Sequence, residues 1–172
     1  MSVPHVSPAP GRASGPLWRP VTAAALTAFV FAALGGTITD TGPWYQSLRK
    51  PSWQPPDWLF GPAWTTIYAF TVAAAVIAWR RAPTRSAREW LLGLFALNGF
   101  LNVLWSLLFF RFQRPDWALI EVVPLWLSIV AIAVATGRYA RPTAWLLAPY
   151  LAWVAFAAFL NLTIVRLNGP FG

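Results

Sequence analysis

The chain has 172 residues, of which 58% are hydrophobic and only 10% are charged. A soluble domain usually carries about a quarter of its residues as charges, so this composition excludes an ordinary water-soluble fold. The chain has no cysteine, and its single histidine is His5. Disulfides and thiolate chemistry are therefore excluded, a single histidine leaves little for a metal site or a catalytic triad, and we expect no bound metal.

The formal net charge is +8, and the basic residues stand in short clusters between long apolar runs. A nucleic-acid-binding domain would instead gather them into one stripe or patch. Arginines in loops and at helix ends are typical of a protein that crosses a membrane several times. We therefore expect a lipid bilayer around the chain and no nucleic-acid partner.

Five stretches are long and apolar enough to cross a bilayer, which takes about 20 residues of helix. The predicted fold class is all-α, an integral membrane bundle of five transmembrane helices. The expected spans are Leu17–Ile38, Pro62–Trp79, Glu89–Phe110, Trp117–Thr136 and Thr143–Val165. Residues 1–16 hold four prolines and two glycines and are expected to form a flexible tail before one transmembrane domain over residues 17–168.

The first connection, Thr39 to Gly61, is long and rich in aromatic residues and prolines. It contains Trp44, Tyr45, Trp53, Trp58 and Phe60, together with Pro43, Pro51, Pro55 and Pro56. A flexible linker would not carry so many aromatic side chains, and proline fixes the backbone dihedral φ. We expect a long ordered loop between helices 1 and 2.

Basic residues also predict the orientation of the bundle. With five spans, eight arginines fall on the side of the N-terminus, and five lysines and arginines fall on the other side. Cytoplasmic loops are enriched in lysine and arginine. The sequence therefore predicts a cytoplasmic N-terminus, with the aromatic loop facing outward, in a bacterial cell membrane.

Tryptophans near helix ends usually form an interfacial belt. Five fit this pattern, namely Trp18, Trp79, Trp90, Trp117 and Trp145. Trp105, Trp126 and Trp153 do not fit it as well, and Trp126 and Trp153 lie some ten residues inside their predicted helices.

Amide side chains share helix faces with aromatic residues, since positions three and four apart lie on one face. The faces carry Asn98, Asn102 and Trp105 on the third helix, Tyr150, Trp153, Ala157 and Asn161 on the fifth, and Trp64 and Tyr68 on the second. Hydrogen bonds between helices, with no ligand, are one interpretation. The convergence favours a second, an aromatic small-molecule pocket with the first loop as its lid.

Glu121 is the only carboxylate well inside a predicted span. Such a residue is a candidate for function, but we expect an ion pair with Arg111 or Arg114, which lie on the same side of the membrane. Pro124 and Pro149 are expected to interrupt or kink their helices.

Small residues recur at every fourth position of the first helix, at Ala24, Ala28, Ala32 and Gly36. This stripe predicts close helix contact, either within the bundle or between two protomers.

Three blocks of uncommon residues occur in order along the chain. They are Trp44-Tyr45-x-x-Leu48-x-Lys50-Pro51-x-Trp53-x-Pro55-Pro56-x-x-x-Phe60-x-x-x-Trp64-x-x-x-Tyr68, then Asn102-x-x-Trp105-x-x-x-Phe109-Phe110, then Pro149-Tyr150-Leu151-x-Trp153 followed by Leu160-Asn161 and Arg166. Over about residues 35–168 they resemble the TspO/MBR family, the tryptophan-rich sensory proteins of bacteria and the translocator proteins of mitochondria.

The resemblance implies a five-helix bundle, usually a homodimer, with a site under the first loop for protoporphyrin or haem and no required cofactor. The site residues carried over by motif are Trp53, Phe60, Trp64, Tyr68, Asn102, Trp105, Trp153 and Ala157, with Asn98 as a neighbouring amide. The implied function is a membrane tetrapyrrole sensor or receptor that regulates tetrapyrrole metabolism or a stress response. Two alternatives stay open. One is a light-dependent porphyrin-degrading enzyme with Trp53 and Trp153 as redox partners, and the other is a small-molecule transporter.

Two features of the sequence limit which ligands are expected to bind. The sterol-recognition pattern needs a tyrosine between an aliphatic residue and a basic one, and the stretch from Leu160 to Arg166 has none, so sterol binding is doubtful. No histidine, cysteine or internal methionine is available to ligate haem iron, which leaves only Tyr68 or Tyr150. Metal-free porphyrin is therefore predicted to bind about as well as haem.

Overall fold

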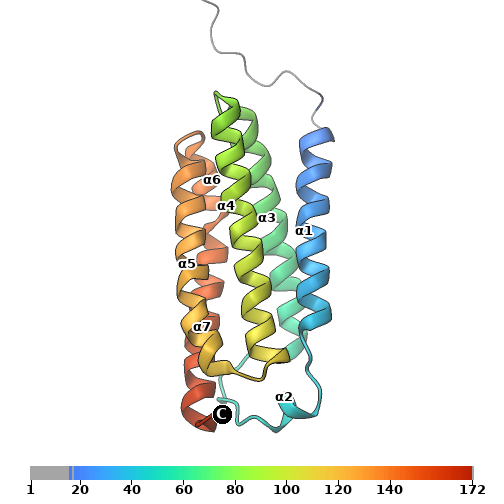
Figure 1. Cartoon of the computed structure of the whole chain (residues 1–172), viewed down its shortest axis with the longest axis vertical. Coiled ribbons are helices and arrows are strands. Elements are labelled where there is room, and N and C mark those ends of the chain that lie inside the picture. The colour runs from blue at the N-terminus through green and yellow to red at the C-terminus, as the bar shows by residue number, and fades with distance from the viewer. Residues whose placement is uncertain (1–15, 17, 172) are drawn as a thin grey trace, which may run out of the picture.

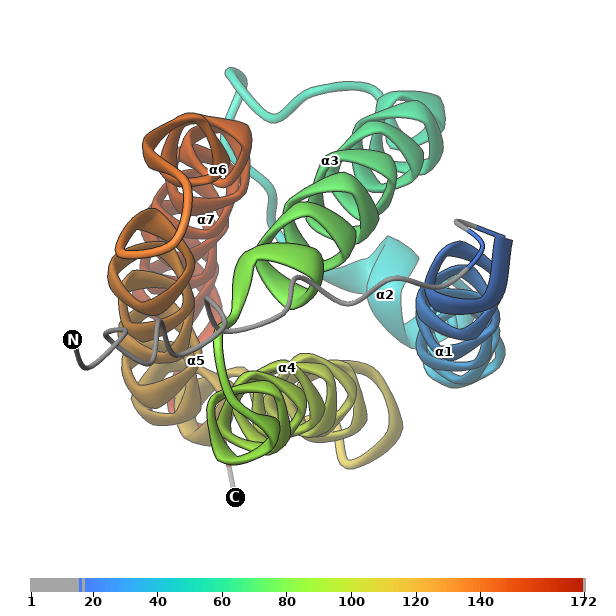
Figure 2. The ribbon, with the colours of Figure 1, turned by 90° about the horizontal axis from the view of Figure 1, so that it is seen from above.

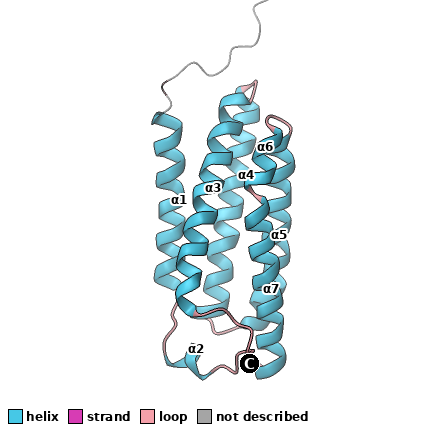
Figure 3. Ribbon diagram, turned by 180° about the vertical axis from the view of Figure 1, so that it is seen from behind, coloured by secondary structure: helices cyan, strands magenta, loops and turns pink. Residues whose placement is uncertain are grey.

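The structure is a computed structural model that describes residue 16 and residues 18–171, the side chain of Arg19 excepted. The tail predicted for residues 1–16 therefore lies almost wholly outside the described residues. Over the described range the chain forms helices and loops only (Figure 3). The elements are α1 (Trp18–Ile38), α2 (Pro43–Ser47), η1 (Asp57–Leu59), α3 (Phe60–Arg81), α4 (Arg85–Ser106), η2 (Leu107–Arg111), α5 (Pro115–Gly137), α6 (Arg141–Leu146) and α7 (Ala148–Asn168).

Five segments are long and apolar enough to cross a membrane. They are Pro20–Ile38, Asp57–Arg81, Arg85–Arg111, Pro115–Gly137 and Arg141–Asn168. Each overlaps one predicted span, so the prediction of an all-α integral membrane bundle is confirmed. The observed segments extend past most predicted ends. The prediction counted only the apolar stretches, and the helices continue into terminal turns that contain arginines and prolines.

The long helices run side by side along one axis (Figure 1). Seen along that axis, α1 lies beside α3 and α4, while α5 and α7 form the opposite side of the bundle (Figure 2). The short helix α2 lies at the same end of the bundle as the C-terminus, away from the start of α1 (Figure 1). We call this the loop end, and the other the arginine end, because α3 stops there at Arg81 and α4 begins there at Arg85.

Prolines and one threonine set several helix boundaries. The Thr84 side chain accepts a hydrogen bond from Ala87 N at 3.1 Å and so caps α4. The fifth predicted span is divided, because α6 ends at Leu146 and α7 begins at Ala148. Pro149 lacks an N–H and its ring would clash with the carbonyl four residues earlier, which confirms the predicted interruption there. Pro124 instead lies inside a continuous α5.

A π-helical turn, η2, follows α4 and holds the first loop against the bundle. It presents Phe109 edge-on to Trp44, with ring centroids 6.0 Å apart, and Phe110 to Tyr45 at 5.6 Å. The turn ends at Arg111, and Gln113, two residues later, has a left-handed φ of 55°.

Hydrogen bonds connect α2 to η1 within the same loop and attach the loop to the end of α7. Tyr45 donates its hydroxyl to Asp57 Oδ1 at 3.2 Å, and Gln54 donates to the Tyr45 hydroxyl at 3.1 Å. Burial, together with the charge of Asp57, raises the pKa of Tyr45 to about 12. Asn168 bonds both backbone groups of Arg49, at 2.7 and 2.9 Å. Whether the loop acts as a lid stays a prediction.

Four of the five tryptophans expected in an interfacial belt are exposed near helix ends, namely Trp18, Trp90, Trp117 and Trp145. Trp79 is instead partly buried and lines a cavity. Of the deeper tryptophans, Trp126 donates its indole N–H to the carbonyl of Leu151 on α7, at 3.2 Å. This bond joins α5 to α7, and Trp126 is 38% exposed.

Close helix contact through the small-residue stripe of α1 stays a prediction, although α1 as a whole packs beside α3 and α4. Ala24 and Ala28 line a cavity, and a Cβ added at Gly36 would meet no atom within 4 Å. Close approach occurs on α4, where a Cβ at Gly99 would lie 2.6 Å from the ring of Phe31. The large Phe31 side chain spans the gap that the small residues leave. A role of the stripe between two protomers stays a prediction.

Replacing Gly99 by alanine is expected to separate α1 from α4, because the added methyl group would overlap the Phe31 ring. Gly93→Ala is the matched control, since a Cβ there meets nothing within 4 Å. Relative to Gly93→Ala, Gly99→Ala should lose about 1–3 kcal/mol of unfolding free energy, the usual cost of overpacking. Thermal unfolding in detergent measures the difference. Equal midpoints for the two variants would contradict the contact.

Candidate functional site

A chain of buried hydrogen bonds crosses the centre of the bundle. Tyr68 donates to Asn102 Oδ1 at 3.1 Å, and Asn102 Nδ2 donates to the Tyr150 hydroxyl at 3.2 Å. Tyr150 in turn donates to Asn98 Oδ1 at 3.2 Å, and Asn98 Nδ2 donates to Ser128 Oγ at 2.8 Å. Side chains of α3, α4, α5 and α7 are thereby joined in one network, which we call the polar chain.

The polar chain confirms the interpretation of Asn98 and Asn102 as hydrogen-bonding links between helices. In lipid such amides must find partners inside the protein. Asn161 plays a similar part between α7 and α5. In the amide orientation that satisfies both of its polar atoms, it donates to Pro115 O at 3.0 Å and accepts from Leu119 N at 3.1 Å.

Aromatic rings from the first loop, α3 and α7 meet beside the polar chain, toward the loop end. Trp53 stacks on Phe159 with centroids 5.2 Å apart and lies edge-on to Phe156 at 6.0 Å. Phe156 contacts Trp153 at 5.6 Å, and Trp153 meets Phe60 at 5.6 Å. These five rings form a continuous set, which we call the aromatic seam. Trp53 is its most accessible predicted member, with 43% of its surface exposed.

Two further predicted tryptophans link the seam to the core. Trp64 stacks on Tyr68 at 5.5 Å and lies edge-on to Tyr150 at 5.9 Å. Trp105 stacks on Phe109 of η2 at 5.2 Å. Both tryptophans, together with Trp153, pack against one apolar cluster that includes Tyr150.

A cavity in the described part of the chain lies toward the arginine end, between α1, α3 and α4. It has a volume of about 550 Å³. Of the nine predicted site residues, Tyr68, Asn98 and Asn102 line it. The other six, which include Trp53 and Trp153, lie outside its wall. The polar chain thus separates this cavity from the aromatic seam, and a ligand-binding role for all nine residues stays a prediction.

The expected ion pair of Glu121 is wrong. Arg114 pairs with Asp116, with Nε–Oδ1 and Nη2–Oδ2 distances of 2.8 and 2.5 Å. Asp116 stands two residues after Arg114 and takes its guanidinium, and Arg111 forms no ion pair in the described part of the chain. Glu121 is only 6% exposed, and neither of its carboxylate oxygens has a hydrogen-bond partner among the described residues.

Trp105 carries a second unpartnered group, its buried indole Nε1. Glu121 lies on α5 between Ala118 and Val122, which belong to two different apolar clusters. Trp105 packs against both of these clusters. A buried donor and a buried acceptor without partners cost free energy, so each calls for an explanation. Binding of a ligand with complementary polar groups would supply one.

Three participants were missed by reasoning from the sequence. Ser128 ends the polar chain, and Phe156 and Phe159 are the ring partners of Trp53. Phe156 follows Trp153 by three residues, so helical spacing offers a signal for it. Ser128 offers only the weak signal of a hydroxyl inside an apolar helix, because its partner is set by packing between α4 and α5.

The groups available to a charged or metal-bearing ligand are limited. The Tyr68 and Tyr150 hydroxyls are both engaged with asparagine amides. Lys50 Nζ lies 3.6 Å above the ring of Tyr45 beside the first loop, and Arg49 is exposed. The loop end therefore offers two cations for acidic groups but no uncommitted tyrosine for iron.

Comparison of the sequence with known proteins identifies the family to which the chain belongs. The model of the TspO/MBR family matches residues 23–167. The tryptophan-rich protein TspO of Chlorobaculum tepidum is 42% identical over 129 residues, which cover 73% of this chain and 79% of that protein. The translocator protein of Bos taurus is 36% identical over 149 residues, or 85% of this chain and 88% of the relative. The tryptophan-rich sensory protein of Cereibacter sphaeroides is 33% identical over 136 residues, or 79% and 84%. The chain is therefore an integral membrane protein that belongs to the TspO/MBR family.

Proposed function

We propose that the protein is a membrane sensor or receptor that binds a tetrapyrrole, protoporphyrin or haem, at the aromatic seam. The observation that carries the proposal is the unbroken set of ring contacts from Trp53 through Phe156 and Trp153 to Phe60. A flat macrocycle gains most from stacking on such rings. The names of relatives, which include sensory and translocator proteins, support a role of this general kind.

Trp53 is the residue that the ligand would contact first as it enters the site. It stands in the loop and not on a helix, and its stacked contact with Phe159 is partly exposed. A macrocycle that replaced Phe159 against the face of Trp53 would need only local movement of the loop. Once inside, a ligand with hydrogen-bond donors and acceptors would satisfy Glu121 and Trp105.

Acidic substituents of the ligand have partners at the same end. Arg49 and Lys50 immediately precede the proline that leads to Trp53. Propionate groups directed toward them would stay near water while the macrocycle lies among rings. This arrangement orients the ligand without any bond to a metal ion.

We further propose that the protein resides in a bacterial cell membrane with its N-terminus in the cytoplasm, and that it forms a homodimer. Arg80, Arg81, Arg85, Arg138 and Arg141 lie at ends of helices on the side where α1 begins. That excess supports the orientation by the positive-inside rule. The exposed apolar face of α1, with Phe29 and Val30, supports a partner protomer.

Substitution of Trp53 or Trp153 by alanine is expected to weaken protoporphyrin binding about tenfold each, because one stacking partner is lost. Trp90→Ala and Trp145→Ala are matched controls, since these side chains are 72% and 79% exposed and lie outside the seam. Titration of detergent-purified protein, followed by quenching of the remaining tryptophans, gives the dissociation constants. Linear quenching, or equal affinity in all four variants, would show that the porphyrin only partitions into detergent.

Protoporphyrin and haem are expected to bind with similar affinity, because both candidate tyrosine ligands already donate to asparagines. The measurement is a parallel titration with the two compounds, together with the absorption spectrum of the haem complex. Much tighter binding of haem, with a spectrum of protein-ligated iron, would contradict the proposed mode of binding.

The orientation is tested with single cysteines, which the natural sequence lacks. Ser47→Cys places a thiol in α2 at the loop end, and Ser86→Cys places one in the first turn of α4; both positions are exposed. A membrane-impermeant maleimide added to intact bacterial cells should label the first variant and reach the second only after lysis. The reverse pattern would overturn the orientation and leave the binding proposal untouched.

A further inference from the structure

The cavity between α1, α3 and α4 is separate from the proposed tetrapyrrole site and differs from it chemically. Its wall is built mainly of small and aliphatic side chains, such as Ala24 and Ala28 on α1, Ala75 on α3 and Ala96 on α4. Its volume of about 550 Å³ lies within the range typical of small-molecule sites. The three helices that enclose it stand together on one side of the bundle (Figure 2).

The composition of this wall fits a flexible hydrocarbon chain better than a rigid aromatic ring system. Small and aliphatic residues make up most of the wall. Its aromatic residues, Phe31, Tyr68, Trp79, Phe95 and Tyr150, form no ring pair with one another among the contacts of the described residues, unlike the rings of the aromatic seam. The inner end is closed by the polar chain, whose Tyr68, Asn98 and Asn102 are already hydrogen-bonded to one another or to Tyr150. An occupant therefore gains little from polar groups at its buried end.

Basic side chains lie at the arginine end of α3 and α4, on the helix faces that line the cavity. Arg80 lies four residues, about one turn, beyond Val76, which lines the cavity on α3. Arg88 lies four residues before Leu92, which lines it on α4. Both arginines thus continue the cavity wall toward the membrane surface, with the exposed Arg81 beside them.

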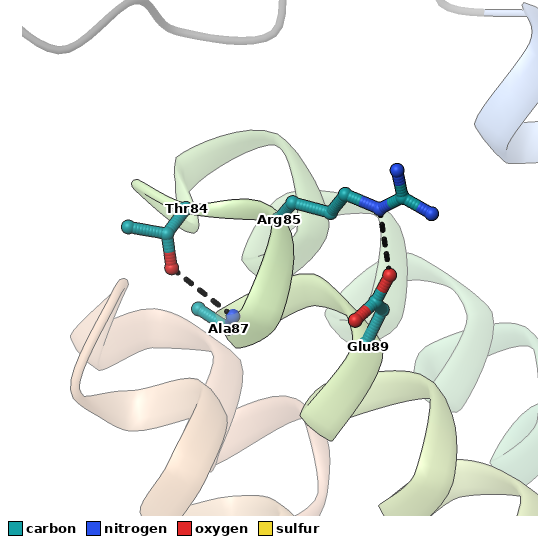
Figure 4. A network of polar contacts seen from close by, with 4 residues as sticks. All are labelled: Thr84, Arg85, Ala87 and Glu89. Carbon is teal, nitrogen blue, oxygen red and sulfur yellow. Dashed lines mark hydrogen bonds and ion pairs between the residues drawn. The ribbon is translucent and has the colours of Figure 1, made fainter.

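The positive charge of this cluster is not neutralised within the described residues. Arg85 forms an ion pair with Glu89, with an Nε–Oε1 distance of 2.7 Å (Figure 4). Arg80, Arg81 and Arg88 form no ion pair in the described part of the chain. Arg88 donates one hydrogen bond, from Nη2 to the carbonyl of Ala82 at 3.2 Å, which holds its guanidinium at the junction of α3 and α4.

We propose that this cavity is a binding site for an anionic phospholipid of the surrounding bilayer. One acyl chain lies between α1, α3 and α4, and the headgroup phosphate is held by Arg80 and Arg88. A basic pocket between transmembrane helices is suited to an anionic headgroup, and arginine pairs with phosphate through two parallel hydrogen bonds. The charge of the mouth selects an anionic lipid over a neutral one with the same chains. The site is independent of the tetrapyrrole proposal.

The site is tested by competition between two lipids with identical acyl chains, phosphatidylglycerol and phosphatidylcholine. Delipidated protein in detergent is mixed with both, and bound lipid is counted by native mass spectrometry. The natural chain should retain one phosphatidylglycerol. In Arg80→Gln/Arg88→Gln its preference over phosphatidylcholine should fall about thirtyfold, since two arginine contacts are lost. Arg80→Lys/Arg88→Lys should keep most of it.

Two controls distinguish a specific lipid site from a general attraction of anionic lipids to the positively charged end of the bundle. Arg141→Gln removes an exposed charge at the same end of the bundle, on α6, and should leave the preference unchanged. Ala28→Phe fills the cavity and should reduce retention of both lipids. Thermal unfolding confirms that each variant is folded, and Arg80→Gln alone, which disturbs no hydrogen bond that the structure shows, should give a smaller drop in the same direction.

Several results would overturn the proposal. One is equal retention of the two lipids by the natural chain, and another is an equal loss of preference in Arg141→Gln. A third is displacement of phosphatidylglycerol by protoporphyrin, with porphyrin binding lost in Ala28→Phe, which would assign the cavity to the tetrapyrrole. Loss of porphyrin binding in Trp53→Ala with normal lipid retention would leave the lipid site standing.

Discussion

The structure depends on one constraint, that polar side chains placed within a membrane-embedded bundle must satisfy one another. Tyr150 meets this constraint at the centre, where it is 2% exposed and accepts from Asn102 while donating to Asn98. Because the surrounding lipid offers no competing partners, these bonds fix how α3, α4, α5 and α7 lie relative to one another. A change at any one member would leave a buried donor or acceptor unpaired.

The polar chain also divides the interior into two regions of different chemistry. Toward the loop end, Phe60 contacts Trp153, and Phe156 joins Trp153 to Trp53. The unpartnered Glu121 and Trp105 lie nearby in the same half of the bundle. Toward the arginine end, α1 stands off from α3 and α4 and leaves an apolar cavity. One region suits a flat aromatic ligand with a few polar groups, and the other suits a hydrocarbon chain. The two proposals therefore assign the ligand and the bilayer lipid to separate regions of the interior.

Much of this arrangement could be predicted from the sequence, because hydropathy and helical spacing depend on local order. The five spans, the break at Pro149 and the shared face of Asn98 and Asn102 follow from such patterns. What the sequence could not predict is which of several nearby side chains contact one another in the folded bundle. Arg114 takes Asp116 and not Glu121, and the close approach of Phe31 on α1 to Gly99 on α4 had no signal in the sequence. The cavity could not be predicted, since it depends on how α1, α3 and α4 are spaced in the bundle, which no local pattern in the sequence encodes.

The central claim, that a tetrapyrrole binds at the aromatic seam and not in the α1–α3–α4 cavity, is tested most directly by a structure of the protein with protoporphyrin in nanodiscs that contain phosphatidylglycerol. We expect the macrocycle against Trp53 and Trp153, with a separate acyl chain beside Ala28. A macrocycle lodged between α1, α3 and α4, with the rings of the seam still in contact with one another, would contradict the account.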